Sequence, residues 1–140
     1  MAVKKTSRKK KAQVVTRGKR KRAIARASIK PGSGLVRVNS QLLSSIQNPF
    51  FKAIAGEALN FVDCKGVDIS VSVNGGGVMG QAQAVRTAIA RALVDHFKDE
   101  KLKEEMIAFD RSLLVEDSRR VEPKKFLGPK ARARFTKSYR

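Results

Sequence analysis

The feature that most limits how this chain can fold is the placement of its positive charge at the two ends. Residues 1–30 hold 13 Lys or Arg and no acid, and residues 118–140 hold nine with Glu122 as their only acid. Residues 31–117, in contrast, carry nine basic and eleven acidic side chains. The middle therefore resembles an ordinary soluble domain, whereas the stretch from Lys4 to Arg26 would repel itself in isolation.

We therefore predict one domain with two basic arms, since 140 residues with 41% hydrophobic side chains suffice for a single modest core. Residues 1–12 are too polar and too charged to fold alone, so we expect a disordered N-terminal extension. Residues 13–117 form the predicted globular α+β domain. Residues 118–140, where Pro123, Gly128 and Pro129 interrupt any helix, form an extended basic C-terminal tail.

The formal net charge of +19 requires a polyanionic partner. Helices that bind a membrane surface place Trp, Phe or Leu opposite their basic face. Residues 1–22 contain no Trp, Phe, Leu or Ile, and the chain has no apolar run of the roughly 18 residues that a span needs. No apolar stretch typical of a secretory signal follows the basic N-terminus, and the single cysteine, Cys64, fits a reducing compartment. We expect nucleic acid as the partner, no membrane association, and a cytoplasmic location.

Two patterns predict strands. Residues 23–29 and 35–39 flank a Pro-Gly turn at 30–34, which is typical of a β-hairpin. Residues 67–74 alternate strictly between apolar and polar side chains, so we expect a strand that is buried on one face only.

Three segments predict helices. Asn48 can cap and Pro49 can open a helix of about three turns, in which Phe50, Ile54, Ala58 and Phe61 recur at helical spacing. A long core helix follows the glycines at 75–77 and runs to about residue 98, and an amphipathic segment spans 102–109. On the long helix, Thr87 and Arg91 point away from the predicted apolar face, which contains Ala82, Val85, Ile89, Ala92, Leu93 and His96.

The stretch from Gly75 to Gly80 matches the G-x-G-x-x-G spacing of dinucleotide-binding loops. A Rossmann strand is buried on both faces, however, whereas residues 67–74 alternate. A phosphate-binding loop would need Lys and Ser or Thr where Gln81 and Ala82 stand. Two compatible interpretations remain: backbone amides that contact an anion at a helix N-terminus, or a tight turn that only glycine permits.

No catalytic constellation is visible. His96 is the only histidine and falls on the apolar helix face, which predicts a packed core residue, and Cys64 has no neighbouring histidine or cysteine. The acids of residues 95–105 are interspersed with lysines, as on a solvated helix. We expect no enzyme, no metal, no cofactor and no small-molecule substrate.

The C-terminal tail spaces its basic residues for phosphate contact. In an extended chain Lys130, Arg132 and Arg134 would lie on one side about 6.6 Å apart. Phe135 or Tyr139 could stack on unpaired bases. Folded RNA suits this pattern better than B-DNA, since the core offers no basic recognition helix.

A series of motifs in this order resembles the universal small-subunit ribosomal protein nine family, in its archaeal and eukaryotic form. The resemblance covers residues from about 14 to 140, so no family role extends to residues 1–12. The motifs are TRGKRK at 16–21, VDI at 67–69 leading into GGG at 75–77, GQA at 80–82, ARAL at 90–93, DRSLL at 110–114, DSRRVE at 117–122 and KSYR at 137–140.

This resemblance implies a compact α+β domain with a mixed β-sheet packed on helices and a left-handed β-α-β crossover, similar to domain two of ribosomal protein S-five. It also implies a place in the head of the small subunit, with ribosomal RNA, neighbouring head proteins and peptidyl-site tRNA as partners. The tail would reach the tRNA through Lys137, Ser138, Tyr139 and Arg140. The residues expected on ribosomal RNA are Arg17, Lys19, Arg20, Lys21, Arg22, Arg26, Gly75, Gly76, Gly77, Arg119, Arg120, Lys124, Lys125, Lys130, Arg132 and Arg134.

Two other hypotheses remain open at this point. Charge alone would also fit a chromatin-like DNA-binding protein, and the glycine spacing alone would fit a nucleotide-dependent oxidoreductase. The RNA-binding and the DNA-binding hypotheses both predict an affinity that falls steeply with salt, by roughly 0.7 to 0.9 log units per contacted phosphate for each log unit of salt.

Overall fold

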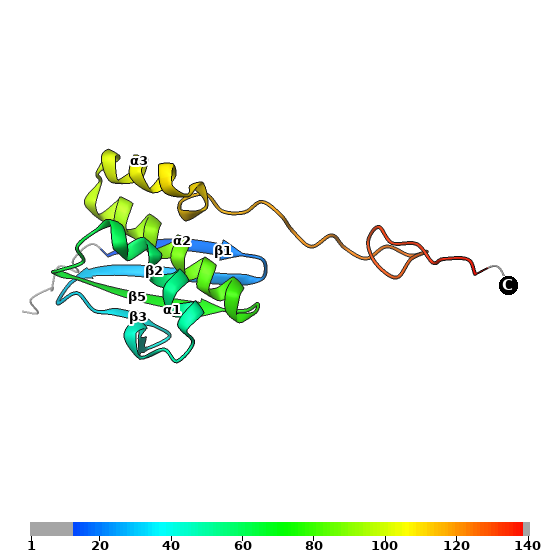
Figure 1. The fold of residues 1–140 in the computed structure, drawn as a ribbon, viewed down its shortest axis with the longest axis horizontal. Coiled ribbons are helices and arrows are strands. Elements are labelled where there is room, and N and C mark those ends of the chain that lie inside the picture. Colours follow the sequence, from blue (N-terminus) through cyan, green and yellow to red (C-terminus); the bar gives the residue numbers. More distant parts are fainter. Residues whose placement is uncertain (1–12, 139–140) are drawn as a thin grey trace, which may run out of the picture.

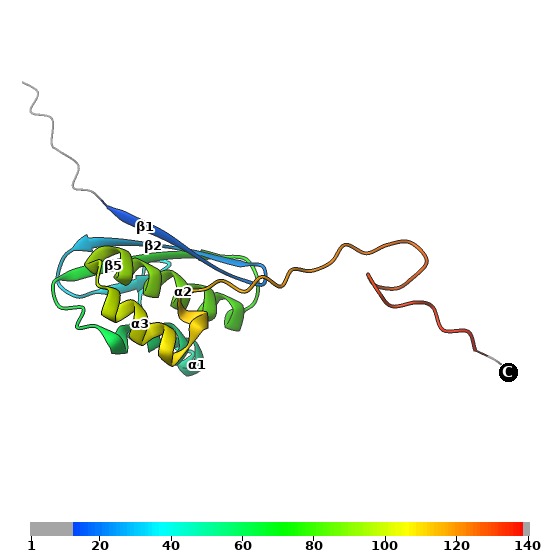
Figure 2. The ribbon, with the colours of Figure 1, turned by 90° about the horizontal axis from the view of Figure 1, so that it is seen from above.

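A five-stranded sheet with its helices on one face makes up the globular part of the chain (Figures 1 and 2). The computed structural model describes residues 13–138. The strands are β1 (Val14–Arg20), β2 (Ala23–Pro31), β3 (Val36–Val38), β4 (Gln41–Leu42) and β5 (Val67–Asn74). The helices are α1 (Pro49–Gly56), α2 (Val78–Phe97) and α3 (Glu100–Phe109), with short 3-10 turns at Leu43–Ser45, Glu57–Phe61 and Arg111–Leu113.

The sheet is mixed, with strand order β1-β2-β5-β3-β4. Its neighbours pair antiparallel except β3 and β5, which run parallel and are connected through α1. Figure 1 views the sheet from its helical side, with β3 and β5 both running from left to right, β5 above β3, and α1 in front. When the strands are turned to point up, β5 lies to the left of β3. The crossover is therefore left-handed, a hand that about one in fifty such connections adopts. The α+β class and this crossover match what the family resemblance implied.

The predicted hairpin between residues 23–29 and 35–39 is wrong. Both segments are strands, but β5 lies between them and pairs with each. The hairpin partner of β2 is β1, which the sequence did not reveal as a strand. The turn between them is formed by Lys21 and Arg22, and Lys21 takes the left-handed conformation (φ 53°) without a glycine or proline to mark it.

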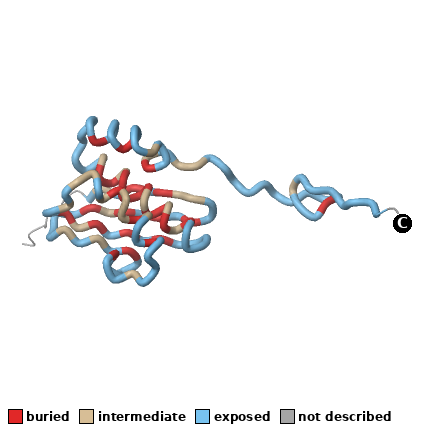
Figure 3. Tube along the Cα trace, in the orientation of Figure 1, coloured by how far each residue is buried: buried red, intermediate tan, exposed pale blue. Residues whose placement is uncertain are grey.

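Small residues let α2 lie very close to β1. A Cβ on Gly18 would stand 2.2 Å from the carbonyl oxygen of Ala84 and 2.6 Å from the amide nitrogen of Ala88. Next to it, the buried Thr16 hydroxyl donates a hydrogen bond to the Ala88 carbonyl at 2.8 Å. Alanines 23, 25 and 27 of β2 are fully buried on the same side. The core therefore sits between the sheet and α2, as the band of buried positions shows (Figure 3).

The first helix begins where the sequence predicts. The Asn48 side chain accepts hydrogen bonds from the amides of Phe50 and Phe51, and Pro49 is the first helical residue. Of the predicted stripe, Ala58 is fully buried and Phe50 is 71% exposed, and Phe51 and Ala55 are buried beside it. These buried residues face inward because α1 packs against α2.

Helix α2 is covered on more than one side. Ala82, Val85, Ile89, Ala92 and Leu93 are buried as predicted. Thr87, expected to point away, is also buried, and its hydroxyl lies 3.1 Å from the Gln83 carbonyl and 3.3 Å from the Ser112 carbonyl. His96, expected in the core, is exposed because it lies in the last turn, just before Lys98 ends the helix in a left-handed conformation. Asp99 then caps α3, and its side chain accepts a hydrogen bond from the Lys101 amide at 3.0 Å.

Beyond Leu113 the described chain has no helix or strand and leaves the domain as a tail (Figure 1). Residues 126–132 turn back in a loop, and Arg132 makes two hydrogen bonds of 2.8 and 2.6 Å to the Glu122 carboxylate. The predicted straight row of Lys130, Arg132 and Arg134 is wrong for this reason. The predicted extension at residues 1–12, and Tyr139 and Arg140, lie outside the described residues.

Candidate nucleic-acid interface

A basic groove of about 890 Å³ opens where three segments meet. The turn of the β1–β2 hairpin contributes Arg20, Lys21 and Arg22, and the loop after β5 contributes Gly76 and Gly77. The start of the tail closes the groove with Arg119, Arg120 and Val121. Segments about 50 and 40 residues apart along the chain thus bring five positively charged side chains to one concave surface.

The loop after β5 requires glycine because its backbone lies very close to the hairpin. Gly75 and Gly76 have φ values of 76° and 68°, which favour glycine. A Cβ on Gly75 would stand 2.7 Å from the Arg22 carbonyl oxygen, and one on Gly76 would stand 2.9 Å from the amide nitrogen of Ala23. The interpretation of the glycines as a tight strand-to-helix turn is therefore confirmed.

The same loop also leaves the N-terminus of α2 accessible. Gly77 is the N-cap, and no side chain accepts a hydrogen bond from the first amides of this helix. The first two helical residues, Val78 and Met79, are about half exposed. Unpaired amides and the helix dipole add partial positive charge to the glycine side of the groove.

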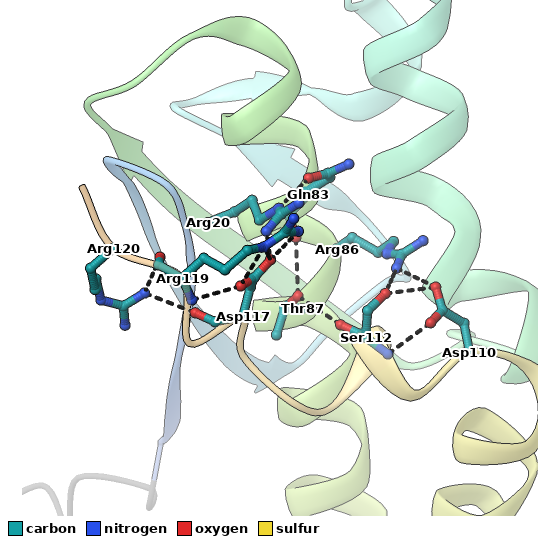
Figure 4. Close-up of polar contacts among 9 residues, drawn as sticks. All are labelled: Arg20, Gln83, Arg86, Thr87, Asp110, Ser112, Asp117, Arg119 and Arg120. Carbon is teal, nitrogen blue, oxygen red and sulfur yellow. Dashed lines mark hydrogen bonds and ion pairs between the residues drawn. The ribbon is translucent and has the colours of Figure 1, made fainter. Parts of the chain in front are cut away.

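Asp117 fixes the start of the tail against the hairpin (Figure 4). Its carboxylate forms an ion pair with Arg20 and receives the Arg119 guanidinium at 2.6 and 2.9 Å. Arg20 also donates to the Gln83 side chain of α2 at 2.8 Å. One acid thus pairs with two of the five groove cations. Within the described residues, Lys21 and Arg22 have no ion-pair partner, and Arg120 donates only to the backbone carbonyls of Asp117 and Arg119.

Two arginines of α2 hold the segment that leads into the tail. Arg91 donates to the Leu114 carbonyl and the Arg17 carbonyl, both at 2.8 Å, and pairs with Glu116 at 3.1 Å. It thereby connects α2, β1 and the tail. Because one planar guanidinium reaches all three, the direction in which the tail leaves the domain is fixed by side chains of the core.

Arg86 makes the second of these attachments, to Asp110, Ser112 and Glu57. Asp110 accepts hydrogen bonds from the hydroxyl and the amide of Ser112, at 2.6 and 2.8 Å. These bonds, together with Arg86, hold the pKa of Asp110 below its ordinary value of 3.8. We name the set Arg86, Arg91, Asp110, Glu116 and Asp117, together with Arg20, the tail joint.

The other predicted RNA residues fall into two groups. Arg17, Lys19 and Arg26 lie on β1 and β2 outside the groove, and Arg17 is 3.6 Å from Glu116. Lys124, Lys125, Lys130, Arg132 and Arg134 lie along the exposed tail, as do Lys137 and Ser138 near its end. The structure therefore gathers only Arg20, Lys21, Arg22, Gly76, Gly77, Arg119 and Arg120 into one groove, with Gly75 beside it.

The sequence did not identify the tail joint. Arg91 was expected to point away from the core, and Arg86, Asp110, Glu116 and Asp117 were assigned no role. One signal was present: Arg86 and Arg91 are the only charged residues between Asn74 and Asp95, in a helix otherwise rich in alanine. A cation on such a helix requires a partner, and the acids at 110, 116 and 117 are close to the tail.

Other features of the described residues point to no further chemistry. Burial and the neighbouring Asp63 raise the pKa of the Cys64 thiol, which disfavours the reactive thiolate. Within residues 13–138, no three His, Cys, Asp or Glu side chains come together as metal ligands would. No helix among them is long and apolar enough to cross a membrane.

Comparison with known proteins gives consistent matches along nearly the whole chain. A family model described as ribosomal protein S9/S16 matches residues 18–140. The chain is 49% identical over 128 residues to the small ribosomal subunit protein uS9 of Halobacterium salinarum, covering 89% of this chain and 97% of that protein. It is 47% identical to the uS9 protein of Methanothrix thermoacetophila (88% and 95% covered) and 43% identical to that of Candida albicans (91% and 96% covered).

Proposed function

This chain belongs to the ribosomal protein S9/S16 family, and from that premise we propose a non-enzymatic structural role in the head of the small ribosomal subunit. In this proposal the basic groove binds ribosomal RNA and the C-terminal tail contacts peptidyl-site tRNA. Neighbouring head proteins are the remaining partners, and the cytoplasmic ribosome is the location.

The observation that carries the RNA proposal is the groove itself. Lys21, Arg22 and Arg120 present positive charge that the described acids leave unpaired, next to the uncapped amides of α2. Phosphates of a folded RNA meet both requirements, because they are closely spaced and accept hydrogen bonds from guanidinium groups and amides alike. A concave site suits a bent RNA backbone better than a straight duplex.

The tail proposal rests on basic side chains that have no acidic partner within the described residues. Residues 133–138 are exposed and lie at the far end of the tail, away from the sheet and helices (Figures 1 and 2). They include Arg134, Phe135 and Lys137, which combine phosphate contact with an exposed aromatic ring. The tail joint gives this segment a fixed origin on the domain. A tail of this kind extends the reach of a small RNA-bound domain to a second nucleic acid.

The RNA proposal is tested by removing two groove charges. We expect the double variant Lys21→Ala/Arg120→Ala to bind small-subunit ribosomal RNA roughly tenfold more weakly per lost contact. The slope of log affinity against log salt should fall by roughly 0.7 to 0.9 per contact. The matched control is Lys101→Ala/Lys103→Ala, which removes two exposed charges from α3.

Equal losses in the two double variants would contradict a specific groove and leave only a general charge effect. Competition with duplex DNA at a fixed salt concentration separates the partners. Equal preference for the two nucleic acids would favour a DNA-binding function instead.

The tRNA contact is tested by proximity. An iron chelate attached to a cysteine at Ser138, in a chain whose Cys64 is replaced by Ser, should cleave peptidyl-site tRNA in its anticodon stem-loop. The same chelate at Phe126, near the middle of the tail, is the control. Cleavage of ribosomal RNA alone from Ser138 would contradict the tRNA contact.

A further inference from the structure

The face of the sheet that no helix covers has a charge pattern of its own. All three helices pack on one side (Figure 2), and strand alternation turns Arg26, Ser72 and Arg37 to the other side. The acids of the helical layer, which include Glu100, Glu104 and Glu105, have no counterpart here. Asp68 is the one acid on the described strands of this face.

Asp68 lies opposite Lys30 in the pairing of β2 with β5, four residues along β2 from Arg26. One of its carboxylate oxygens accepts hydrogen bonds from the amides of Ser33, Gly34 and Leu35 at 2.8 to 3.1 Å. These bonds fix the turn between β2 and β3. Apart from Asp68 and from Glu116 beside Arg17, the described residues of the open face carry positive charge and hydroxyl groups without a nearby acid.

Two arginines stand directly opposite each other on this face. The pairing of β1 with β2 places Arg17 beside Arg26, and the pairing of β2 with β5 places Ser72 on the other side of Arg26. Like charges directly opposite across strands destabilise a sheet unless something neutralises them. Arg17 is near Glu116, but Arg26 has no hydrogen-bond or ion-pair partner among the described residues.

A hollow of about 310 Å³ lies beside Arg26, between β2 and β5. It is lined by Arg22, Ile24, Arg26, Ser72, Asn74 and Gly75. Arg22 also lines the basic groove, so the two concave surfaces meet at the end of the hairpin. The hollow combines two guanidinium groups with a hydroxyl and an amide, which are the groups that bind phosphate and ribose.

The open face holds no aromatic side chain on any of the described strands, and its guanidinium and hydroxyl groups suit contacts with the sugar–phosphate backbone. We propose that the RNA bound in the groove continues around the end of the hairpin, and that its sugar–phosphate backbone occupies the hollow between Arg26 and Ser72. The open sheet face is thus a second RNA surface, distinct from the tail, and the inference rests on the proposed RNA-binding function.

One charge-matched pair of variants tests the hollow. Binding to small-subunit ribosomal RNA, transcribed in vitro, is measured against salt for Arg26→Ala and for Lys103→Ala. Both side chains are exposed, and each variant removes one positive charge. We expect Arg26→Ala to lose roughly tenfold in affinity and roughly 0.7 to 0.9 in salt slope. Lys103→Ala should bind as the unchanged chain does.

A tethered probe gives an independent readout that does not depend on removing a contact. An iron chelate on a cysteine at Ser72, with Cys64 replaced by Ser, should cleave the RNA at one site, whereas the same chelate at Lys103 should not.

The outcomes separate this inference from the function on which it rests. If Arg26→Ala matches Lys103→Ala and the Ser72 probe cleaves nothing, while Lys21→Ala still weakens binding, the hollow is not an RNA site and the groove is. If the unchanged chain fails to bind the ribosomal RNA, both the function and the inference are overturned.

Discussion

The two arginines of helix α2 pair with acids of the same chain, whereas most basic residues of the described tail do not. Arg86 pairs with Glu57 and Asp110, Arg91 pairs with Glu116, and Arg20 pairs with Asp117. Beyond Asp117 the described tail has one acid, Glu122, which pairs with Arg132. The other basic residues of the tail from Lys124 onward have no partner within the described residues. The same residue type stabilises the fold in one region and remains available for a polyanion in the other.

The two regions also differ in what holds them in place. The core buries 24 hydrophobic residues between sheet and helices. The tail loop is closed by the Glu122–Arg132 pair, whose side chains are 49% and 86% exposed. An exposed pair of this kind contributes about 0 to 1 kcal/mol. The described tail therefore lacks the apolar packing that holds the core in place.

The largest expected effect comes from truncating one side chain in each region. Leu93 is fully buried, and Phe126 is 83% exposed in the tail. We expect Leu93→Ala to lower the free energy of unfolding by about 2 to 5 kcal/mol and Phe126→Ala to change it by less than about 0.5 kcal/mol. Urea denaturation measures both. A comparable loss in Phe126→Ala would mean that the tail packs on the core in solution.

The second comparison tests the close contact between β1 and α2. Gly18→Ala would place a Cβ against the backbone of Ala84 and Ala88, so we expect a loss of about 1 to 3 kcal/mol in the free energy of unfolding. Gly56→Ala is the matched control, because nothing lies within 4 Å of its Cβ position. That control should be neutral or gain up to about 1 kcal/mol. Equal stability of the two variants would contradict the tight helix–strand contact.

The third prediction concerns the joint between the regions. Arg91→Met removes the bonds to Leu114, Arg17 and Glu116, at a cost of roughly 1 to 2 kcal/mol. Hydrogen exchange at residues 114–117 should become faster, while exchange in residues 118–138 should not change. Arg111→Met, an exposed position beside the joint, is the control. Unchanged exchange at 114–117 would show that Arg91 does not fix the start of the tail.

The smallest expected effect is on acid stability. The pKa of Asp110 is lower in the fold than its ordinary value because Ser112 and Arg86 favour the ionised carboxylate. This carboxylate therefore stabilises the fold fully above its ordinary pKa, and the contribution is lost as the pH falls through the lowered value. We expect Asp110→Asn to flatten the decline in unfolding free energy between about pH 5 and about pH 2. An Asp110→Asn curve parallel to that of the unchanged chain would contradict this assignment.

The sequence predicted the individual helices and strands better than the pairing between strands. The alternation at 67–74, the Asn48-Pro49 helix start and the apolar face of α2 were each visible in local spacing. Pairing was not, because the Pro-Gly turn at 31–32 is a strong local signal for a hairpin that β5 interrupts. Strand pairing depends on residues distant along the chain, and local turn chemistry does not determine it.

The sequence predicted many residues of the candidate site, but not which of them lie together in space. Charge and glycine spacing identified the groove residues, since positive charge without local acids needs an external partner. The tail joint was missed because Arg86 and Arg91 bond Asp110 and Glu116, which lie 24 and 25 residues further along the chain. Fold-dependent contacts of this kind leave only a weak signal, a lone cation on an apolar helix.

We propose a division of tasks between a domain that binds ribosomal RNA and a tail that contacts tRNA. The most direct test assembles small subunits with a chain that ends at Thr136 and measures assembly and peptidyl-site tRNA affinity in the same particles. We predict normal assembly and weakened tRNA binding. Unchanged tRNA affinity and reading-frame fidelity would contradict the role of the tail, and failed assembly would contradict the division of tasks.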